Sequence, residues 1–237
     1  KLGQLTISIL QGRDGNQRAE LDELVGWLEC EWRPDVVLMT NVLLSGIVPE
    51  MKRRLGVPIV ATLQGDDIFL EMLPPDIRAR CIEMIRANCR HVDRFIATCG
   101  YYADFMSQYL GLPREKFEVI YPGINLAGFD APAPPRKDST FVLGYFARIA
   151  PEKGLHLLVD AFIQLKRSAD TASCRLRYGG WLGGHNKAYH ESIKRKLDNA
   201  GLATEVERVD APSHADKVRF LQGIDVLCVP APYREPK

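Results

Sequence analysis

The chain has 237 residues, of which 46% are apolar and 26% are charged, a composition typical of a globular protein. Its 31 Lys and Arg residues nearly balance its 30 Asp and Glu residues, which leaves a formal net charge of +1. This balance excludes a global field that would attract nucleic acid or an anionic membrane, so any anion-binding site must be local.

Short apolar runs alternate with amphipathic stretches through the first half of the chain. Strands are predicted at residues 5–10, 35–39, 57–63, 94–98 and 117–121. Helices are predicted where apolar residues recur at helical spacing, at residues 21–28, 47–55 and 75–88 and in a further segment that ends at Leu110. Repeated strand-helix units with apolar strands predict a parallel sheet covered by helices on both faces.

A proline-rich stretch separates the two halves of the chain. Residues 130–138 contain three prolines and no core-forming residue larger than alanine, which is typical of a linker or a long surface connection. The sequence therefore predicts two Rossmann-like α/β domains, at residues 1–130 and 141–237, joined by a linker at 131–140.

The alternation restarts after this linker. Strands are predicted at residues 141–146, 175–178, 205–209 and 225–229. One helix carries apolar residues from Leu155 to Leu165 and another carries Ile193 and Leu197. Ser213 and Asp216 have the spacing of a capping box at the start of a last short helix.

The cysteines and the apolar runs bear on localisation. The six cysteines show no C-x-x-C pair and no zinc-site spacing, which favours a reducing, cytosolic compartment. No apolar run is long enough to span a bilayer. Contact with the inner face of a membrane as a peripheral protein stays open.

The loops that follow the strands are the expected ligand sites, because open parallel sheets bind ligands beyond the carboxyl ends of their strands. The loop after Phe146 contains Arg148 and Lys153 and leads directly into a helix. Two cations at a helix N-terminus suit phosphate oxygens. The alternative is a solvated surface pair in which one of these cations bridges to Glu152, but the position at a strand end favours the phosphate site.

The motifs of the second half resemble those of glycosyltransferase family 4. The resemblance is carried by Gly144-x3-Arg148-x4-Lys153-Gly154, by Gly179-Gly180, and by residues 225–230 followed by Glu235. Taken alone, Glu235 is an acidic residue that could accept hydrogen bonds from sugar hydroxyls or simply be solvated.

The first half of the chain resembles the same family. Residues 62–67, Thr-Leu-Gln-Gly-Asp-Asp, resemble the family segment T-x-H-G-x-D. Residues 92–97 resemble its A-D-x-I-I-x-x-S strand, and residues 119–125 resemble its V-I-x-N-G-V-D hinge signature.

The resemblance implies a fold and an activity. The fold would be of the GT-B type, two Rossmann-like domains with parallel sheets, the second incomplete in this chain. The activity would be transfer of a hexose from a UDP-, GDP- or ADP-sugar to an unidentified glycan, lipid or small-molecule acceptor, with retention of configuration. No metal or other cofactor is expected.

The resemblance also assigns roles to single residues. Arg148 and Lys153 would neutralise the donor diphosphate, and Glu235 would contact the donor sugar. Gln64 stands at the position of the family histidine beside the donor sugar, and Asp67 matches the family aspartate. Both are candidate catalytic residues, although the amide of Gln64 cannot titrate as an imidazole does.

Two family features lie outside the sequence. The first strand with its glycine-rich loop would precede Leu5, and the second of two family glutamates would follow Lys237. We therefore expect a fragment truncated at both ends, with weak donor binding and little activity. Two rival functions stay open: a nucleotide-sugar 2-epimerase of the same architecture, and a sugar-nucleotide-binding protein without catalytic activity.

Overall fold

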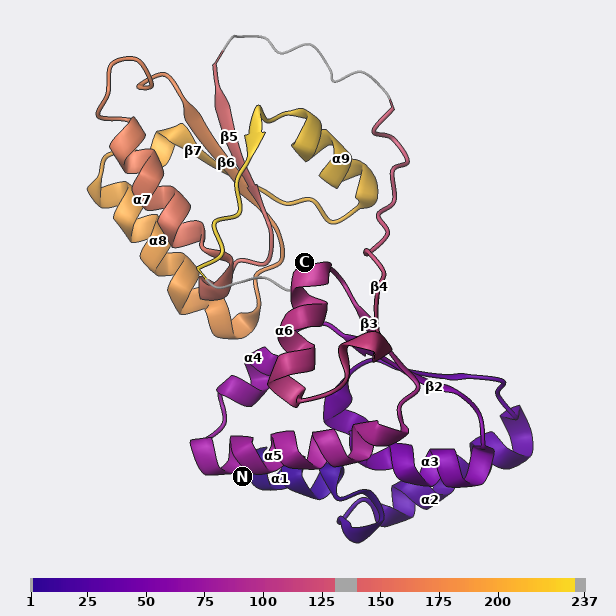
Figure 1. Ribbon diagram of the computed structural model, residues 1–237. Coiled ribbons are helices and arrows are strands. Elements are labelled where there is room, and N and C mark those ends of the chain that lie inside the picture. Colours follow the sequence, from indigo (N-terminus) through magenta and orange to yellow (C-terminus); the bar gives the residue numbers. More distant parts are fainter. Residues whose placement is uncertain (1, 131–139, 233–237) are drawn as a thin grey trace. The chain divides into compact units, whose positions relative to one another are not determined.

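The computed structural model describes residues 2–130 and 140–232 (Figure 1). The chain divides after Gly123 into two compact units. The domain boundary at residue 130 stays a prediction, and residues 131–139 of the predicted linker lie outside the described residues. Each unit has its own hydrophobic core.

The first unit is built on a four-stranded sheet in which neighbouring strands are parallel and follow the order β1-β2-β3-β4. Its strands are β1 (Val37–Met39), β2 (Ile59–Leu63), β3 (Arg94–Ala97) and β4 (Phe117–Val119). Its helices are α1 (Leu2–Leu10), α2 (Arg18–Trp27), α3 (Val48–Leu55), α4 (Asp66–Glu71), α5 (Pro75–Asn88) and α6 (Gly100–Leu110). The parallel sheet confirms the architecture predicted for this half of the chain.

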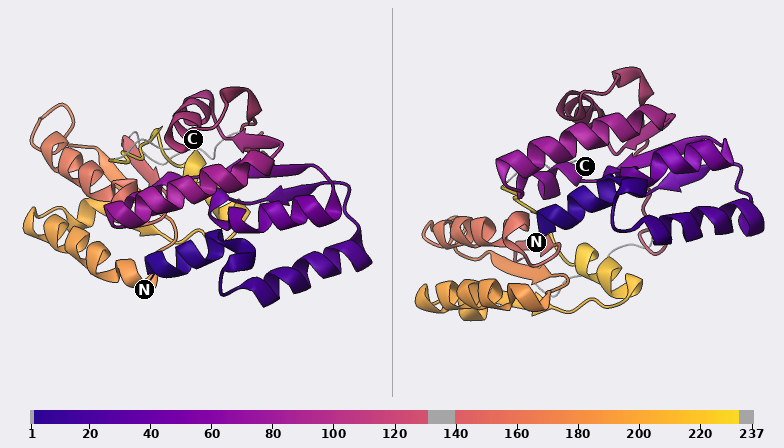
Figure 2. Two further views of the ribbon diagram at one scale, coloured as in Figure 1. Left: turned by 60° about the horizontal axis from the view of Figure 1, so that its bottom comes forward. Right: turned by 90° about the horizontal axis from the view of Figure 1, so that it is seen from below.

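The strand predicted at residues 5–10 is wrong, because this segment lies within helix α1. The helix buries Ile7 and Leu10, which are three residues apart, and packs against α5 and the 3-10 turn Val42–Ile47 (Figure 2). Asn88 of α5 donates a hydrogen bond of 2.9 Å to the Leu10 carbonyl at the end of α1. A short apolar run fits a strand and a buried helix equally well, and only its neighbours decide between them.

The second unit contains a four-stranded parallel sheet in the order β7-β6-β5-β8. Its strands are β5 (Val142–Phe146), β6 (Arg175–Gly179), β7 (Val206–Val209) and β8 (Val226–Leu227). Its helices are α7 (Leu155–Leu165), α8 (Lys187–Asn199) and α9 (His214–Gln222). Because β6 and β8 lie on opposite sides of β5, the strand order reverses there, which creates the crevice where open α/β sheets bind ligands.

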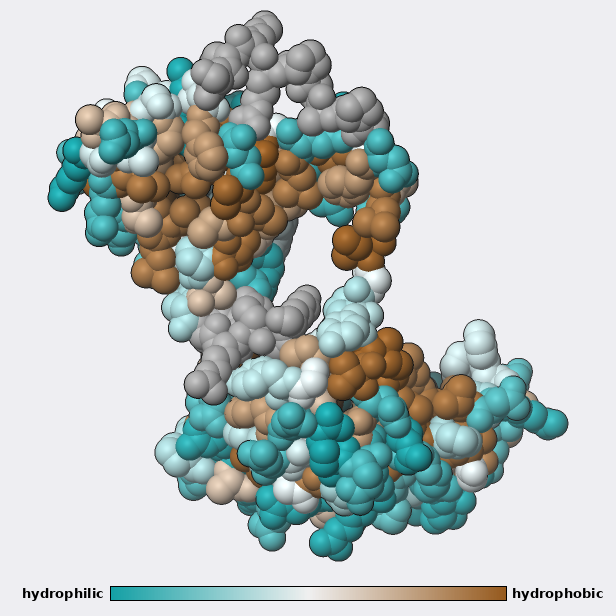
Figure 3. Space-filling view, turned by 45° about the horizontal axis from the view of Figure 1, so that its top comes forward, coloured by the Kyte–Doolittle hydropathy of each residue, from teal (hydrophilic) through white to brown (hydrophobic). Residues whose placement is uncertain are grey.

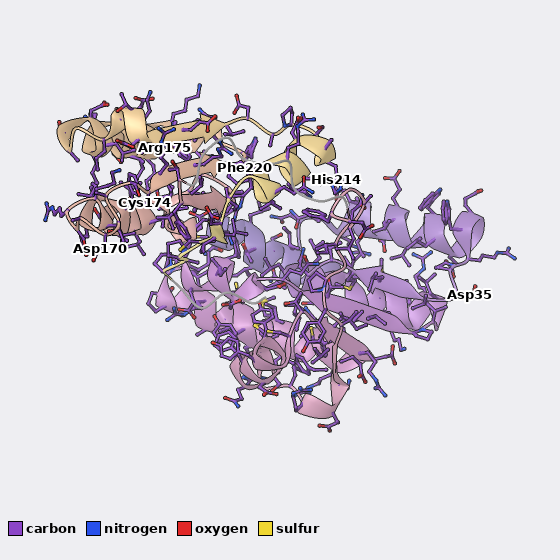
Figure 4. The ribbon with its side chains drawn as sticks, turned by 90° about the horizontal axis from the view of Figure 1, so that it is seen from above. Asp35, Asp170, Cys174, Arg175, His214 and Phe220 are labelled. Carbon is purple, nitrogen blue, oxygen red and sulfur yellow. The ribbon has the colours of Figure 1, made fainter. Side chains whose placement is uncertain are left out.

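Helices cover both faces of this second sheet (Figure 1). On the face of α7 and α8, Tyr145 and Tyr178 are buried with the apolar residues of both helices. On the other face, the rings of Phe146 and Phe220 are 5.0 Å apart, and Figure 4 shows Phe220 and His214 on the same helix, α9. The capping box predicted for α9 is confirmed, since the Ser213 and Asp216 side chains each bond the other's backbone N–H.

The edge strand β8 leaves apolar side chains at the surface. Val226 and Leu227 are about half exposed, and apolar residues reach the visible surface of this unit in Figure 3. The strand is also shorter than the predicted 225–229. Asp225 and Cys228 nevertheless donate backbone hydrogen bonds to the carbonyls of Val142 and Gly144 on β5. In the part of the chain that the structure describes, no helix is long and apolar enough to cross a membrane.

Candidate functional site

The loop between β5 and α7 holds Arg148 at the carboxyl end of the central strand of the second unit. The buried Tyr145 hydroxyl donates a hydrogen bond of 2.9 Å to the Arg148 carbonyl, and the Ile149 N–H donates one of 2.9 Å to the Trp181 carbonyl. These bonds fix the backbone of the loop from within its own sheet and from the loop after β6. The Arg148 side chain is 56% exposed, so its guanidinium is accessible to a ligand.

The ion pair proposed as the alternative role for this loop is present in the structure. Nη1 of Arg148 lies 3.6 Å from Oε1 of Glu152, and both side chains are partly exposed. A solvent-exposed pair of this kind stabilises a protein by about 0 to 1 kcal/mol. An anionic ligand could therefore replace Glu152 as the partner of Arg148 at little cost.

Gly154 brings the loop after β8 against the start of α7. It has a φ of +75°, and a Cβ at this position would lie 1.8 Å from the Pro230 carbonyl oxygen. Gly180 plays the same role on the other side of β5, since a Cβ there would lie 1.9 Å from the Ala147 carbonyl oxygen. The glycines of the sequence motif thus let three loops meet at the carboxyl edge of the sheet.

A cavity of about 920 Å³ opens at this edge. The loops after β5, β6 and β7 line it, through residues 146–148, 180–182 and 210–212 together with Arg208. Three of the loops expected to bind a ligand therefore share one cavity, and Arg148 lies in its wall. Its volume is within the range of small-molecule sites.

The other two predicted donor-site residues are Lys153 and Glu235, and Lys153 is not among the described residues that line this cavity. Lys153 ends the 3-10 turn Pro151–Lys153 and precedes Gly154, the N-cap of α7. At the start of the helix, the His156 N–H donates to the Tyr189 hydroxyl at 3.1 Å, so this amide already has a partner. Glu235 lies outside the described residues, and its role stays a prediction.

Gln64 lies at the carboxyl edge of the sheet of the first unit, between two smaller cavities. One of about 440 Å³ and one of about 220 Å³ both include Gln64 in their lining. The Gln64 amide group is exposed and donates a long hydrogen bond of 3.4 Å to the Thr62 hydroxyl. An exposed amide in this position can donate to a ligand and accept from it.

Asp67 is held by a neighbouring tyrosine. The Tyr102 hydroxyl donates to Oδ1 of Asp67 at 2.6 Å and accepts from the Gly65 N–H at 2.8 Å. Burial and the Asp67 carboxylate raise the pKa of Tyr102, so the hydroxyl stays protonated and remains a donor. Asp67 thus has a structural role as the hydrogen-bond acceptor of Tyr102, and its catalytic role stays a prediction.

Asp66 joins the loops after β1 and β2. Its buried carboxylate accepts hydrogen bonds from the Val42 N–H at 2.8 Å and the Gln64 N–H at 3.1 Å. Burial raises the pKa of Asp66, whereas the backbone donors oppose this shift. The carboxylate therefore fixes the backbone of Gln64 relative to the neighbouring strand.

Several residues of these sites were not predicted. Trp181, Arg208 and Asp210 line the large cavity, and Asn41 lines the cavity beside Gln64. All four lie at or just beyond strand ends, a signal that the sequence contains. Without a motif of their own, however, they could not be told from other loop residues.

Within residues 2–130 and 140–232, no three His, Cys, Asp or Glu side chains are grouped so that they could hold a metal ion. That the reaction needs no metal stays a prediction.

Comparison with known proteins shows the family. The model of Glycosyltransferase Family 4 matches residues 13–127, and the model of Glycosyl transferases group 1 matches residues 129–236. The fold is of the GT-B type, and the chain belongs to these glycosyltransferases. The prediction of family and fold is confirmed.

The individual relatives of this chain are longer proteins. D-inositol 3-phosphate glycosyltransferase of Segniliparus rotundus is 26% identical over 216 residues, which cover 84% of this chain and 46% of the relative. The crystal structure of Anabaena HepE in complex with UDP has a TM-score of 0.74 at 17% identity, over 93% of this chain and 59% of HepE. Sucrose-phosphate synthase of Thermosynechococcus elongatus has a TM-score of 0.68 at 15% identity, over 94% and 57% of the two chains. The chain thus spans about half the length of these relatives.

Proposed function

We propose that the protein transfers a hexose from a nucleoside diphosphate sugar to an acceptor hydroxyl, with retention of configuration and without a metal cofactor. The observation that carries this proposal is Arg148, which lies at the carboxyl end of β5 in the wall of the cavity of about 920 Å³. HepE, which shares the fold, has been crystallised with UDP and with UDP-glucose. UDP-glucose is therefore the first donor to test.

The proposed chemistry depends on stabilising the leaving group. The bond between the anomeric carbon and the diphosphate oxygen breaks, and its electron pair leaves with the diphosphate. The acceptor oxygen forms the new bond to the anomeric carbon on the face that the diphosphate leaves, and its proton passes to the departing diphosphate oxygen. Arg148 and Lys153 would neutralise the charge that develops on the diphosphate, which is the main stabilisation that such a site can offer.

The remaining assignments concern the sugar. Glu235 would accept hydrogen bonds from hydroxyls of the donor sugar, and the Gln64 amide would hold the reacting sugar or the acceptor. Asp67 would act mainly by holding Tyr102 and the Gly65 backbone, as its hydrogen bond indicates. Catalysis would then consist mostly of positioning and of electrostatic stabilisation.

The two rival functions differ in their products. A 2-epimerase would isomerise the donor without any acceptor, whereas a binding protein would bind UDP and leave the donor intact. Incubation of the intact protein with UDP-glucose and a panel of sugars, followed by NMR of the products, separates these outcomes. We expect UDP release together with a new glycoside that keeps the donor's anomeric configuration.

The donor site itself is tested by an Arg148→Ala substitution. A hydrogen bond to a charged group contributes about 1.5 to 3 kcal/mol, so we expect UDP to bind about tenfold more weakly or worse. The matched control is Arg195→Ala, because Arg195 is an exposed arginine of α8 outside the cavity lining. Calorimetric titration measures the UDP affinity of both variants. Equal affinity in the two would show that Arg148 does not contact the donor.

A further inference from the structure

The cavity of about 440 Å³ beside Gln64 lies at the carboxyl ends of β1 and β2, within the first unit. It is lined by Thr40, Asn41, Leu43, Gln64, Gly65 and Asp66. The adjoining cavity of about 220 Å³ adds Thr62, Thr98 and Tyr121, which each carry a hydroxyl, to the lining. Gln64 belongs to both, so one ligand could extend across this edge of the sheet.

The polar groups of the lining are mostly neutral. Hydroxyls and amides, such as those of Thr40, Asn41 and Gln64, both donate and accept hydrogen bonds. Sugar hydroxyls do the same, whereas the oxygens of a phosphate dianion only accept. The lining therefore complements a compound with many hydroxyls.

Asn41 has an acceptor that lacks a donor. Its Oδ1 is shielded from water, and no hydrogen-bond partner for it exists among the described residues. On the other side of the amide, Nδ2 donates a long bond of 3.3 Å to the exposed Thr40 hydroxyl. A buried acceptor without a partner is costly, so rotation of this amide toward a ligand hydroxyl would be favourable.

The charge at this edge is negative. The buried Asp66 carboxylate accepts from the Val42 and Gln64 backbone, and Asp67 follows it at the start of α4. The residues that line the two cavities are neutral apart from Asp66. Charges interact more strongly where water is partly excluded, so a carboxylate here disfavours an anionic ligand.

We propose that the acceptor is an uncharged sugar or polyol that binds at this edge through hydrogen bonds to Asn41 and Gln64, rather than a phosphorylated compound. The proposal rests on the glycosyltransferase function proposed above and narrows its acceptor. It separates this protein from its Segniliparus relative, whose name specifies a phosphorylated inositol.

Matched pairs of compounds test the charge preference. The pairs are glucose with glucose 6-phosphate, and inositol with D-inositol 3-phosphate, each offered to the intact protein. Binding is followed by saturation-transfer NMR with UDP at saturation, so that the donor phosphate site is filled. We expect the neutral member of at least one pair to bind at least tenfold more tightly than its phosphate ester. Tighter binding of the phosphate ester in both pairs, or no binding of any of the four, would overturn the proposal.

A charge substitution tests the location. Thr40 is exposed and lines the cavity, so Thr40→Lys can place an ammonium group there without disturbing the core. We expect the ratio of neutral to phosphorylated ligand binding to fall about tenfold, while the uncharged Thr40→Gln control keeps the wild-type ratio. An unchanged ratio in Thr40→Lys would place the acceptor elsewhere.

The substitution Asn41→Ala tests whether the unpaired Asn41 side chain binds the ligand. Loss of one neutral hydrogen bond costs about 1 kcal/mol, so we expect the neutral ligand to bind about fivefold more weakly. Unchanged affinity would exclude Asn41 from the site.

Donor consumption is measured separately. If UDP-glucose is never consumed, the proposed function fails, and the binding ratios still decide the class of ligand at this edge.

Discussion

At the scale of single residues, hydrogen bonds between loops hold the predicted site residues in place. Gln64 is fixed through its backbone N–H by Asp66, and the next residue, Gly65, donates to the Tyr102 hydroxyl. The sequence placed Arg148 and Gln64 just beyond strand ends, and the resemblance to the family made Gln64 a candidate; the roles of both residues stay predictions. The sequence could not indicate Tyr102, which is 37 residues from Gly65 in the chain and meets it only in the folded unit.

Tyr102→Phe removes a hydroxyl and keeps the buried ring. The Gly65 N–H and the Asp67 carboxylate each lose a partner, so we expect the free energy of unfolding to fall by about 1 to 3 kcal/mol. Tyr109→Phe on the same helix is the control, because its hydroxyl bonds the exposed Glu71 and water can replace it. Urea denaturation measures the free energy of unfolding of both variants. An equal loss in both would show that the two hydrogen bonds of Tyr102 contribute no more to stability than the exposed bond of Tyr109.

At the scale of secondary-structure elements, most strands and helices follow from apolar spacing. The helix predicted at 75–88 is α5, and the strand predicted at 141–146 is β5 to within one residue. The predictions failed where a segment is short. Residues 5–10 are part of α1, which buries Ile7 and Leu10 and packs against α5, a contact between distant segments that no local pattern contains.

Gly154 links three elements, since it caps α7, follows the loop after β5 and touches Pro230 after β8. Gly201 has a similar φ of +70°, but a Cβ there would meet nothing within 4 Å. We expect Gly201→Ala to cost about 1 to 2 kcal/mol for the left-handed backbone alone. For Gly154→Ala the collision with the Pro230 carbonyl adds to this strain, so we expect a loss at least twice as large, together with weaker UDP binding. Thermal unfolding with and without UDP measures both effects, and similar losses would show that the contact with Pro230 relaxes easily.

At the scale of the whole molecule, the chain holds two cores, each with its own parallel sheet and its own cavities. The large cavity with Arg148 belongs to the second unit, and the two cavities around Gln64 belong to the first. Our proposals therefore place the donor phosphates in the second unit and the acceptor in the first. This division makes a direct test possible.

UDP should act on the second unit. We expect saturating UDP to slow amide hydrogen exchange in residues 146–156, 180–186 and 208–213, since binding stabilises a folded unit by about 2.7 kcal/mol at 100 times Kd. Uridine, which lacks the phosphates, is the control and should protect residues 146–156 much less. Protection confined to residues 59–67 would place the nucleotide in the first unit and contradict the proposed donor site.

The sequence by itself determined the alternation of strands and helices, the family, and the cation at the carboxyl end of β5. These features depend on local spacing, on short motifs and on the general position of ligand sites in parallel sheets. Only the tertiary structure decided that residues 5–10 are helical, that Asp66 bonds Val42, and that Asn41 lines the cavity beside Gln64 with no donor for its oxygen among the described residues. The reason is that these contacts join different strands and loops, and which loops meet is set by the order of strands in the sheet.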